Sequence, residues 1–170
     1  TVTRLVTKKK SQIFSADTVV KNLYKKKNFL RKLKKKFNFT TNNSPKILIK
    51  DFIKKNKKNI KKIEQFVHPH VRSEFKNFLK RKENILVSEI PLLIESNLTN
   101  YFDVVIFVGA KKKIRIKRYI SKGGNISFFR ILENRQDKPQ KKIKHCDYVI
   151  NNNKSLAALK KNVKIVKEKI

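Results

Sequence analysis

FDVVIFV, residues 102–108, carries the clearest strand signal of the chain, because an unbroken run of apolar residues follows Asp103. Such a run is typical of a strand buried on both faces, as in a parallel sheet. On either side, NILVS at 84–88 and DYVI at 147–150 also indicate strands, and a short strand is expected at 12–14. Helical patterns separate these strands. The sequence therefore predicts an α/β fold with a parallel sheet and right-handed crossovers.

The helices are predicted from apolar residues that repeat at helical spacing. Asp17 stands where a strand gives way to a helix, and Asp is among the best N-caps. Pro69 suits the first turn of a helix, because that position needs no N–H donor. Gly123 and Gly124 open a segment that is expected to be polar. Helices are expected at 1–10, from Asp17, from 25, at 47–66, from His68, at 111–120 and after Ser155.

Length and composition limit the class of protein. The 170 residues suit one domain, and a hydrophobic fraction of 39% supports a packed core. No apolar run approaches the roughly 18–20 residues that cross a bilayer. Cys146 is the single cysteine, which excludes a disulfide framework and a cysteine metal site and fits a reducing compartment. The sequence predicts a cytoplasmic protein without a membrane partner.

The formal net charge of +33 allows two interpretations. A basic nucleic-acid-binding module would show such a charge and steep salt dependence. However, only eight of the 45 basic residues are Arg, and the rest are Lys in a chain also rich in Asn and Ile. A protein that reads bases more often uses the bidentate fork of Arg. We therefore favour a compositional bias and expect no specific nucleic acid, although the charge would attract any polyanionic substrate.

Four segments, taken together and in this order, resemble the dephospho-CoA kinases. Their spacing also agrees with that family, and they extend over essentially the whole chain. They are IFSAD at 13–17, VHPHVR at 67–72, IPLLIE at 90–95 and DYVINN at 147–152. The resemblance implies ATP- and Mg²⁺-dependent phosphorylation of the ribose 3′-hydroxyl of dephospho-CoA, the last step of coenzyme A synthesis. A nucleotide kinase with another acceptor is the alternative among enzymes.

The resemblance also implies an architecture for residues 1–170. It is a P-loop NTPase-type parallel sheet flanked by helices in a single, monomeric domain. A helical acceptor-binding insertion is expected near 25–83 and a lid near 121–140. The family's P-loop ends in Gly-Lys-Ser-Thr directly before the first helix, and Thr1 resembles the start of that helix. With no Met in the chain, we expect the first strand and the P-loop to precede Thr1 and the chain alone to be inactive.

Asp17 is the candidate for the catalytic carboxylate. Phosphoryl transfer relies on positioning and on an acidic group that accepts the proton of the attacking hydroxyl. The resemblance assigns this role to the second Asp of the family's turn, which is Asp17 here, whereas Ser15 replaces the first. The alternative role of Asp17 is a helix N-cap. No residue is assigned to a metal.

Candidate acceptor-binding residues come from two of the four segments. His68 and Arg72 are four residues apart and hence on one helix face, so they could hold the phosphates or the pantetheine arm. Their alternative is a helix-start His and a surface Arg. Pro91, Leu92 and Glu95 follow a strand, and ligands bind at the carboxyl ends of strands in open α/β sheets. Leu92 could instead be core, and Glu95 could simply cap its loop.

Candidate ATP-binding residues are implied by the resemblance. Thr1 would be the last P-loop residue, and Asn152 would border the adenine or be an ordinary turn residue. Arg118 and Arg130 match the arginines of the helix before the lid and of the lid itself. Such side chains neutralise the charge of the transferring phosphoryl group. Their alternative is a solvated basic face.

Overall fold

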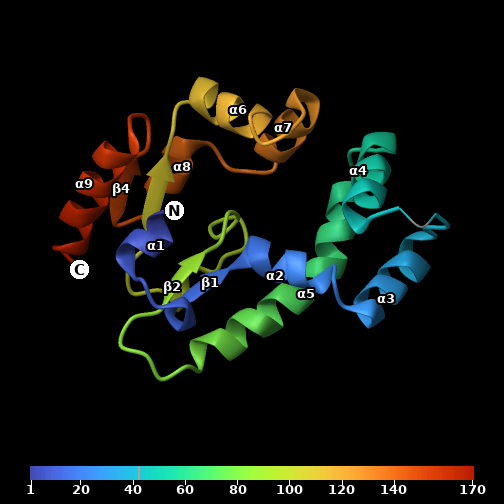
Figure 1. The fold of residues 1–170 in the computed structure, drawn as a ribbon, viewed down its shortest axis with the longest axis horizontal. Helices are drawn as coiled ribbons and strands as arrows, with labels where there is room; N and C mark the ends of the chain where they lie inside the picture. The colour runs from blue at the N-terminus through green and yellow to red at the C-terminus, as the bar shows by residue number, and fades with distance from the viewer. Residues whose placement is uncertain (42) are drawn as a thin grey trace. The chain divides into compact units, whose positions relative to one another are not determined.

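The computed structural model describes residues 1–41 and 43–170, which form two compact units (Figure 1). One unit is Ser11–Ile90, and the other joins Thr1–Lys10 to Pro91–Ile170. Each contains a parallel pair of strands with helices around it, so the predicted mixed α/β class is confirmed. Within the described residues, no helix is both long and apolar enough to cross a membrane.

The strands lie close to their predicted places. Those predicted at 84–88 and 102–108 are shorter than expected, whereas those predicted at 12–14 and 147–150 keep their length and are shifted by one residue. In the first unit β1 (Ile13–Ser15) runs parallel to β2 (Val87–Glu89), with Ser15 opposite Glu89. In the second, β3 (Ile106–Gly109) runs parallel to β4 (Tyr148–Asn151).

The strand predicted from residue 102 begins only at Ile106 because the residue before it is bonded differently. The backbone N–H of Val105 donates to Oδ2 of Asp147 at 2.7 Å, and its carbonyl accepts from the N–H of Asp147 at 2.9 Å. The N–H of Val105 is therefore satisfied by a side chain rather than by the regular ladder.

The unit Ser11–Ile90 is mostly helical, and phenylalanine rings fill its interior. Phe14 of β1 packs against Phe75 and Phe78, with ring centroids 5.3 and 5.5 Å apart. A second group of rings includes Phe37 and Phe66, whose ring centroids are 5.7 Å apart. The helices are α2 (Ala16–Leu23), α3 (Lys27–Phe37), α4 (Pro45–Lys55) and α5 (Asn59–Leu79).

The boundary between the two helices predicted at 47–66 and from His68 was placed wrongly. Pro69 lies inside α5, and the chain breaks earlier, between Lys55 and Asn59. At this break Asn56 accepts from the N–H of Lys58 at 2.9 Å, and the buried Asn59 side chain donates to the carbonyl of Phe52 at 2.8 Å. Pro removes one helical hydrogen bond. Burial of apolar residues on both sides of it keeps α5 continuous.

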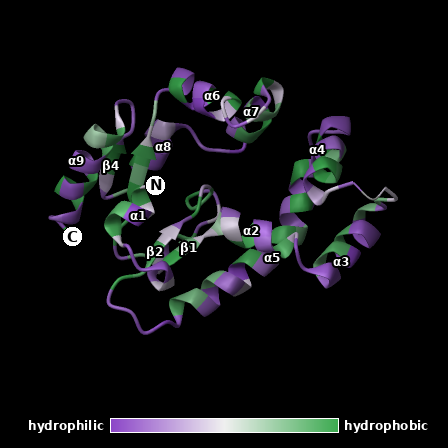
Figure 2. Ribbon diagram, in the orientation of Figure 1, coloured by the Kyte–Doolittle hydropathy of each residue, from purple (hydrophilic) through white to green (hydrophobic). Residues whose placement is uncertain are grey.

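The other unit has its core where α9 covers β4. The buried cluster contains Ile150 with Leu159, Val163 and Val166, and α1 packs against it. Figure 2 shows hydrophobic and hydrophilic residues along both α5 and α9, as expected of helices with one buried face. The helices are α1 (Val2–Val6), α6 (Lys112–Ile120), α7 (Ile126–Glu133), α8 (Pro139–Ile143) and α9 (Leu156–Lys167).

Two helix predictions in this unit need comment. The N-terminal helix was predicted over 1–10 but ends at Val6. The final helix is confirmed with its cap, because Oγ of Ser155 accepts from the N–H of Ala158 at 3.3 Å.

The segment after Gly124, for which only a polar composition was expected, contains the helix α7. Asn125 begins this helix by accepting hydrogen bonds from the N–H groups of Ser127 at 2.9 Å and Phe128 at 3.3 Å. Phe129 is buried, with its ring 5.5 Å from that of Tyr119 on α6. The capping Asn and the buried ring together explain the helix that follows the two glycines.

We expect Gly124→Ala to destabilise the turn between α6 and α7. A Cβ atom at Gly124 would lie 2.2 Å from ring carbons of Tyr119 and 2.6 Å from its carbonyl oxygen. Relief of this overlap requires movement of the backbone, so the free energy of unfolding should fall by about 2–4 kcal/mol. Urea unfolding measures the loss.

Gly123→Ala is the matched control. Gly123 has φ of +76° but open space around its Cβ position, so only the left-handed backbone resists the substitution. The expected cost is about 1 kcal/mol. Equal losses in the two variants would show that the close approach to Tyr119 has no role.

Candidate functional site

Asp17 lies in the first turn of α2, directly after β1. Ser15, not Asp17, is the N-cap, because its backbone is extended and its Oγ accepts from the N–H of Thr18 at 3.4 Å. The N-cap alternative for Asp17 is therefore wrong. Its carboxylate is exposed and favourably placed at the positive end of the helix dipole. A carboxylate without a capping role is available for chemistry.

A second carboxylate, that of Glu89, ends the neighbouring strand. Glu89 is opposite Ser15 in the parallel register, two residues before Asp17. Both acidic residues are exposed and belong to the carboxyl edge of the β1–β2 pair. No three acidic, His or Cys residues in the described part of the chain gather in a way that could hold a metal alone.

His68 and Arg72 lie one turn apart on α5 and therefore share a helix face. Arg72 is exposed and His68 is half-buried. The prediction that they begin a helix is wrong, since α5 starts nine residues before His68. The three residues Asp17, His68 and Arg72 all belong to the unit Ser11–Ile90.

The helical part of this unit also contains a hollow of about 590 Å³. Its volume is within the range of pockets that hold small molecules, roughly 300–1,000 Å³. Half-buried aromatic rings form its walls, and exposed lysines stand beside them. The lining residues are Lys36, Phe37, Asn38, Phe52, Lys62, Gln65 and Phe66.

In the other unit, Pro91, Leu92 and Glu95 lie on a series of tight turns after β2. Pro91 is exposed and Leu92 half-buried. Oε1 of Glu95 accepts from the backbone N–H of Asp137 at 2.7 Å and pairs with Nζ of Lys142 at 2.8 Å. Glu95 therefore ties its loop to a distant segment rather than capping the loop itself.

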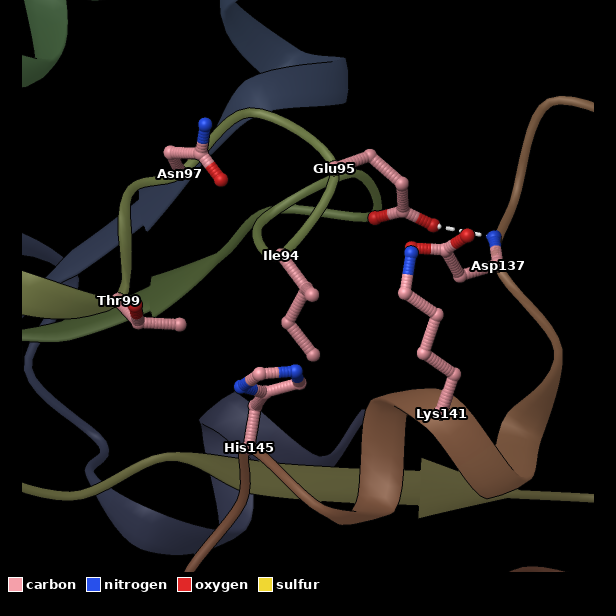
Figure 3. A pocket seen from close by; sticks show the side chains of 7 residues that line it. All are labelled: Ile94, Glu95, Asn97, Thr99, Asp137, Lys141 and His145. Atoms are coloured by element: carbon pink, nitrogen blue, oxygen red, sulfur yellow. Dashed lines mark hydrogen bonds and ion pairs between the residues drawn. The ribbon is translucent and has the colours of Figure 1, made fainter.

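The other oxygen of Glu95 has a different environment. Oε2 is buried and accepts no hydrogen bond from the described residues. Glu95 borders a hollow of about 440 Å³, in which Figure 3 shows Lys141 and His145 on the side opposite Ile94 and Asn97. The hollow therefore has a polar lining on both sides.

Arg118 and Asn152 are brought together at the carboxyl ends of β3 and β4. Nη1 of Arg118 donates to the carbonyl of Asn152 at 3.0 Å, and the N–H of Asn152 donates to the carbonyl of Gly109 at 2.7 Å. The side chain of Asn153 accepts from the N–H of Lys111 at 2.7 Å. These contacts fix the loop after β4 against the corner that leads into α6.

Arg130 and Thr1 belong to the same unit but make fewer contacts. Arg130 is exposed on α7, and its guanidinium pairs with no acidic residue in the described part of the chain. Thr1 is exposed at the N-cap position of α1 and makes no side-chain capping bond.

A charged cluster holds α7 to α6. Glu133 accepts from Nζ of Lys112 at 2.6 Å and from Nη2 of Arg115 at 2.8 Å, with its side chain 20% exposed. The hydrogen bond from Lys112, reinforced by Arg115, holds the pKa of Glu133 below its usual range against the opposing effect of burial. The cluster stabilises the helix pair only while Glu133 is ionised.

We therefore expect Glu133→Gln to lower the free energy of unfolding by about 1–3 kcal/mol at pH 7. Because the folded pKa is depressed, the stabilisation is present above the unfolded value of about 4.3 and is lost as the pH falls through the folded pKa. Urea unfolding between pH 7 and pH 3 should show the free energies of unfolding of the wild type and of Glu133→Gln becoming equal as the pH falls.

Glu168→Gln is the control for this experiment. Glu168 also pairs with a lysine, Lys164, at 3.7 Å, but its side chain is 61% exposed. Exposed pairs contribute about 0–1 kcal/mol. The role of the cluster would be contradicted if Glu168→Gln lowered the free energy of unfolding as much as Glu133→Gln does. It would also be contradicted if the loss caused by Glu133→Gln did not change with pH.

Lys142 is a residue that sequence reasoning missed. Its side chain is only 8% exposed. The sequence carries no signal for this burial, because 37 lysines are present and Lys142 follows another lysine in a short basic stretch.

Comparison with known proteins gives a consistent result. The model of the dephospho-CoA kinase family matches residues 1–158. A dephospho-CoA kinase of Fusobacterium nucleatum is 24% identical over 169 residues, covering 96% of this chain and 88% of its own length. The enzyme of Bartonella quintana is 30% identical, covering 85% of this chain and 77% of its own.

The fold of this chain is also similar to that of solved structures. A crystal structure from Thermus thermophilus matches with a TM-score of 0.71 at 22% identity, over 93% of this chain and 84% of that one. Dephospho-CoA kinase from Campylobacter jejuni matches with a TM-score of 0.59 at 23% identity, over 92% and 84% of the two chains. At these identities the likeness concerns the fold.

Proposed function

Because the chain belongs to the dephospho-CoA kinase family, we propose that it transfers the γ-phosphoryl group of ATP to the ribose 3′-hydroxyl of dephospho-CoA, with Asp17 as the base. The family is one of ATP-dependent kinases with a P-loop fold, and its reaction is the last step of coenzyme A synthesis. The observation that carries the proposal is the family match over residues 1–158, together with the four motifs.

Asp17 accepts the proton of the attacking hydroxyl in this proposal. Its carboxylate is exposed, has no capping role and belongs to the carboxyl edge of the β1–β2 pair. Ligands of open α/β folds bind at this edge. The transition state of phosphoryl transfer is loose, so the protein contributes mainly by positioning and by charge.

Five residues bind the acceptor. Arg72 supplies a cation for a phosphate of dephospho-CoA, with His68 on the same helix face. Pro91 and Leu92 offer apolar contact. Glu95 offers its second carboxylate oxygen, Oε2, which accepts no hydrogen bond from the described residues. We extend the acceptor-binding region to the helical insertion near 25–83, where the aromatic hollow provides walls for the uncharged pantetheine arm.

Four residues bind ATP. Arg118 and Asn152, joined by a hydrogen bond at the ends of β3 and β4, border the nucleotide. Arg130 neutralises charge on the transferring phosphoryl group from the lid near 121–140, which is supported by its exposure and its lack of an acidic partner among the described residues. Thr1 contributes its hydroxyl at the start of α1.

Mg²⁺ fits this proposal as a companion of ATP. It usually binds through one or two carboxylates, retained waters and substrate phosphates rather than in an all-protein cage. The carboxylates of Asp17 and Glu89 share one edge of a strand pair, and no larger acidic cluster exists in the described ranges. Bound there, the ion would neutralise charge on the β- and γ-phosphates.

A comparison of phosphoryl acceptors tests the proposal. The 170 residues contain no G-x-x-x-x-G-K-[ST] sequence, so the assay uses the chain alone and the chain with the family's first strand and P-loop joined ahead of Thr1. With ATP and Mg²⁺, we expect the extended chain to prefer dephospho-CoA over AMP by about 100-fold or more in kcat/KM. Equal use of both acceptors would favour a nucleotide kinase of another specificity.

A further inference from the structure

Lys142 of α8 has an unusual position for a lysine in so basic a chain. Nζ pairs with Oε1 of Glu95 at 2.8 Å and donates to the carbonyl of Pro91 at 3.2 Å and to Oε1 of Gln136 at 3.4 Å. An ammonium group has three N–H donors, so all three have an acceptor. A buried charge with satisfied donors holds one geometry, because any displacement leaves it unpaired at a cost of several kcal/mol.

These bonds join two segments that are far apart in the sequence. Pro91 and Lys142 are 51 positions apart, and Glu95 and Asp137 are 42 apart. One segment carries the acceptor candidates at 91–95, and the other leads from α7 into α8. The ammonium of Lys142 and the carboxylate of Glu95 thus hold the end of the predicted lid against the predicted acceptor segment.

The same contacts determine how the Glu95 carboxylate is oriented. Oε1 receives two donors, the ammonium of Lys142 and the N–H of Asp137, so the carboxylate cannot rotate without losing both. Oε2 remains buried and without a donor among the described residues. A buried carboxylate oxygen without a donor is costly, so the geometry suits a hydroxyl or amide N–H on a ligand.

We propose that Lys142 is a positioning residue for the acceptor: it orients Glu95 so that Oε2 accepts a hydrogen bond from a hydroxyl or amide N–H of dephospho-CoA. The inference rests on the proposed function, because it names how the same acceptor is held. A phosphate group is excluded as the partner, since its charge would repel the carboxylate. The pantetheine arm, with amide and hydroxyl donors, has the required chemistry.

A double-mutant cycle tests the inference. It compares Lys142→Met, Glu95→Gln and the double variant with the wild-type chain, using isothermal titration with dephospho-CoA and urea unfolding. Because Lys142 acts through Glu95, each single variant and the double variant should weaken the Kd by a similar factor of about ten or more. Stability should follow another pattern. Lys142→Met leaves a buried, unpaired carboxylate and should lower the urea midpoint most, and the double variant should recover much of this loss.

The double variant separates positioning from folding, because it removes both charges and should remain folded even if Lys142→Met does not. Lys164→Met is the matched control, since Lys164 also pairs with a glutamate but is 78% exposed, and its Kd should be unchanged. Recovery of tight binding together with stability in the double variant would overturn the inference, as would additive losses of binding. Equal binding by all variants would also overturn it while leaving the proposed function intact. Absence of binding by the wild-type chain would instead contradict the assignment of the acceptor.

Discussion

Replacement of Asp17 by Asn should lower kcat for coenzyme A formation by a factor of about 10²–10⁴, the usual contribution of a general base. The amide has the shape of the carboxylate but cannot accept the proton of the 3′-hydroxyl. The fold should be kept, because Asp17 is exposed and Ser15 caps α2, with only the loss of about 0.3–1 kcal/mol expected when a charge is removed from the helix N-terminus. The measurement is steady-state turnover of the P-loop-bearing chain, with urea unfolding of the same preparations.

Ser15→Ala is the control for Asp17→Asn. It removes the side-chain cap of α2, so the free energy of unfolding should fall by about 1 kcal/mol. Turnover should fall much less than in the Asp17 variant. If Asp17→Asn keeps near-wild-type turnover, Asp17 is a structural residue and not the base.

Replacement of Arg130 by Met should lower kcat by a factor of about 10²–10³, as expected when a charge-stabilising donor is removed from a transition state. Arg130 is exposed on α7 and has no acidic partner among the described residues, so its loss should leave stability within about 0.5 kcal/mol. The kcat of Arg130→Lys should lie between that of the wild type and that of Arg130→Met, because lysine keeps the charge but lacks the planar fork.

Lys113→Met supplies the comparison for Arg130. Lys113 is an exposed basic residue of α6 to which we assign no role. In a chain with a net charge of +33, loss of one surface cation should change turnover less than twofold. If both variants lose activity equally, Arg130 acts only through the general field of the protein, and the lid role fails.

The sequence predicted the class of fold because buried strands leave a local signal. The apolar run at 102–108 and the DYVI segment each lie where a strand is found, although β3 begins four residues later than predicted. The ends of strands depend on partners elsewhere in the chain. Asp147 engages the backbone of Val105, and nothing in the run itself reveals this.

The predicted helix boundaries were wrong where the prediction relied on a single residue type. Pro69 suggested the start of a helix, but burial on both sides keeps α5 continuous. The break lies instead where the side chain of Asn56 accepts from the N–H of Lys58 and that of Asn59 donates to the carbonyl of Phe52. Gly123 and Gly124 form only the turn before a capped helix that was not predicted. In both places tertiary packing outweighs local propensity.

The candidate site was predicted unevenly for the same reason. Motifs identify residues such as Asp17, whose chemistry depends on a local strand-to-helix switch. They do not identify Lys142, whose role depends on a carboxylate 47 residues earlier in the chain and on its own burial. Among so many lysines, only the fold distinguishes the one that is enclosed.

The product of the reaction tests the central claim most directly. Dephospho-CoA, ATP and Mg²⁺ would be incubated with the P-loop-bearing chain, and the product identified by ³¹P nuclear magnetic resonance and mass spectrometry. We predict one added phosphoryl group, as a monoester on the ribose 3′-oxygen, and its loss in the Asp17→Asn variant. A phosphoryl group at another position, or no product from a folded chain that binds ATP, would contradict the account.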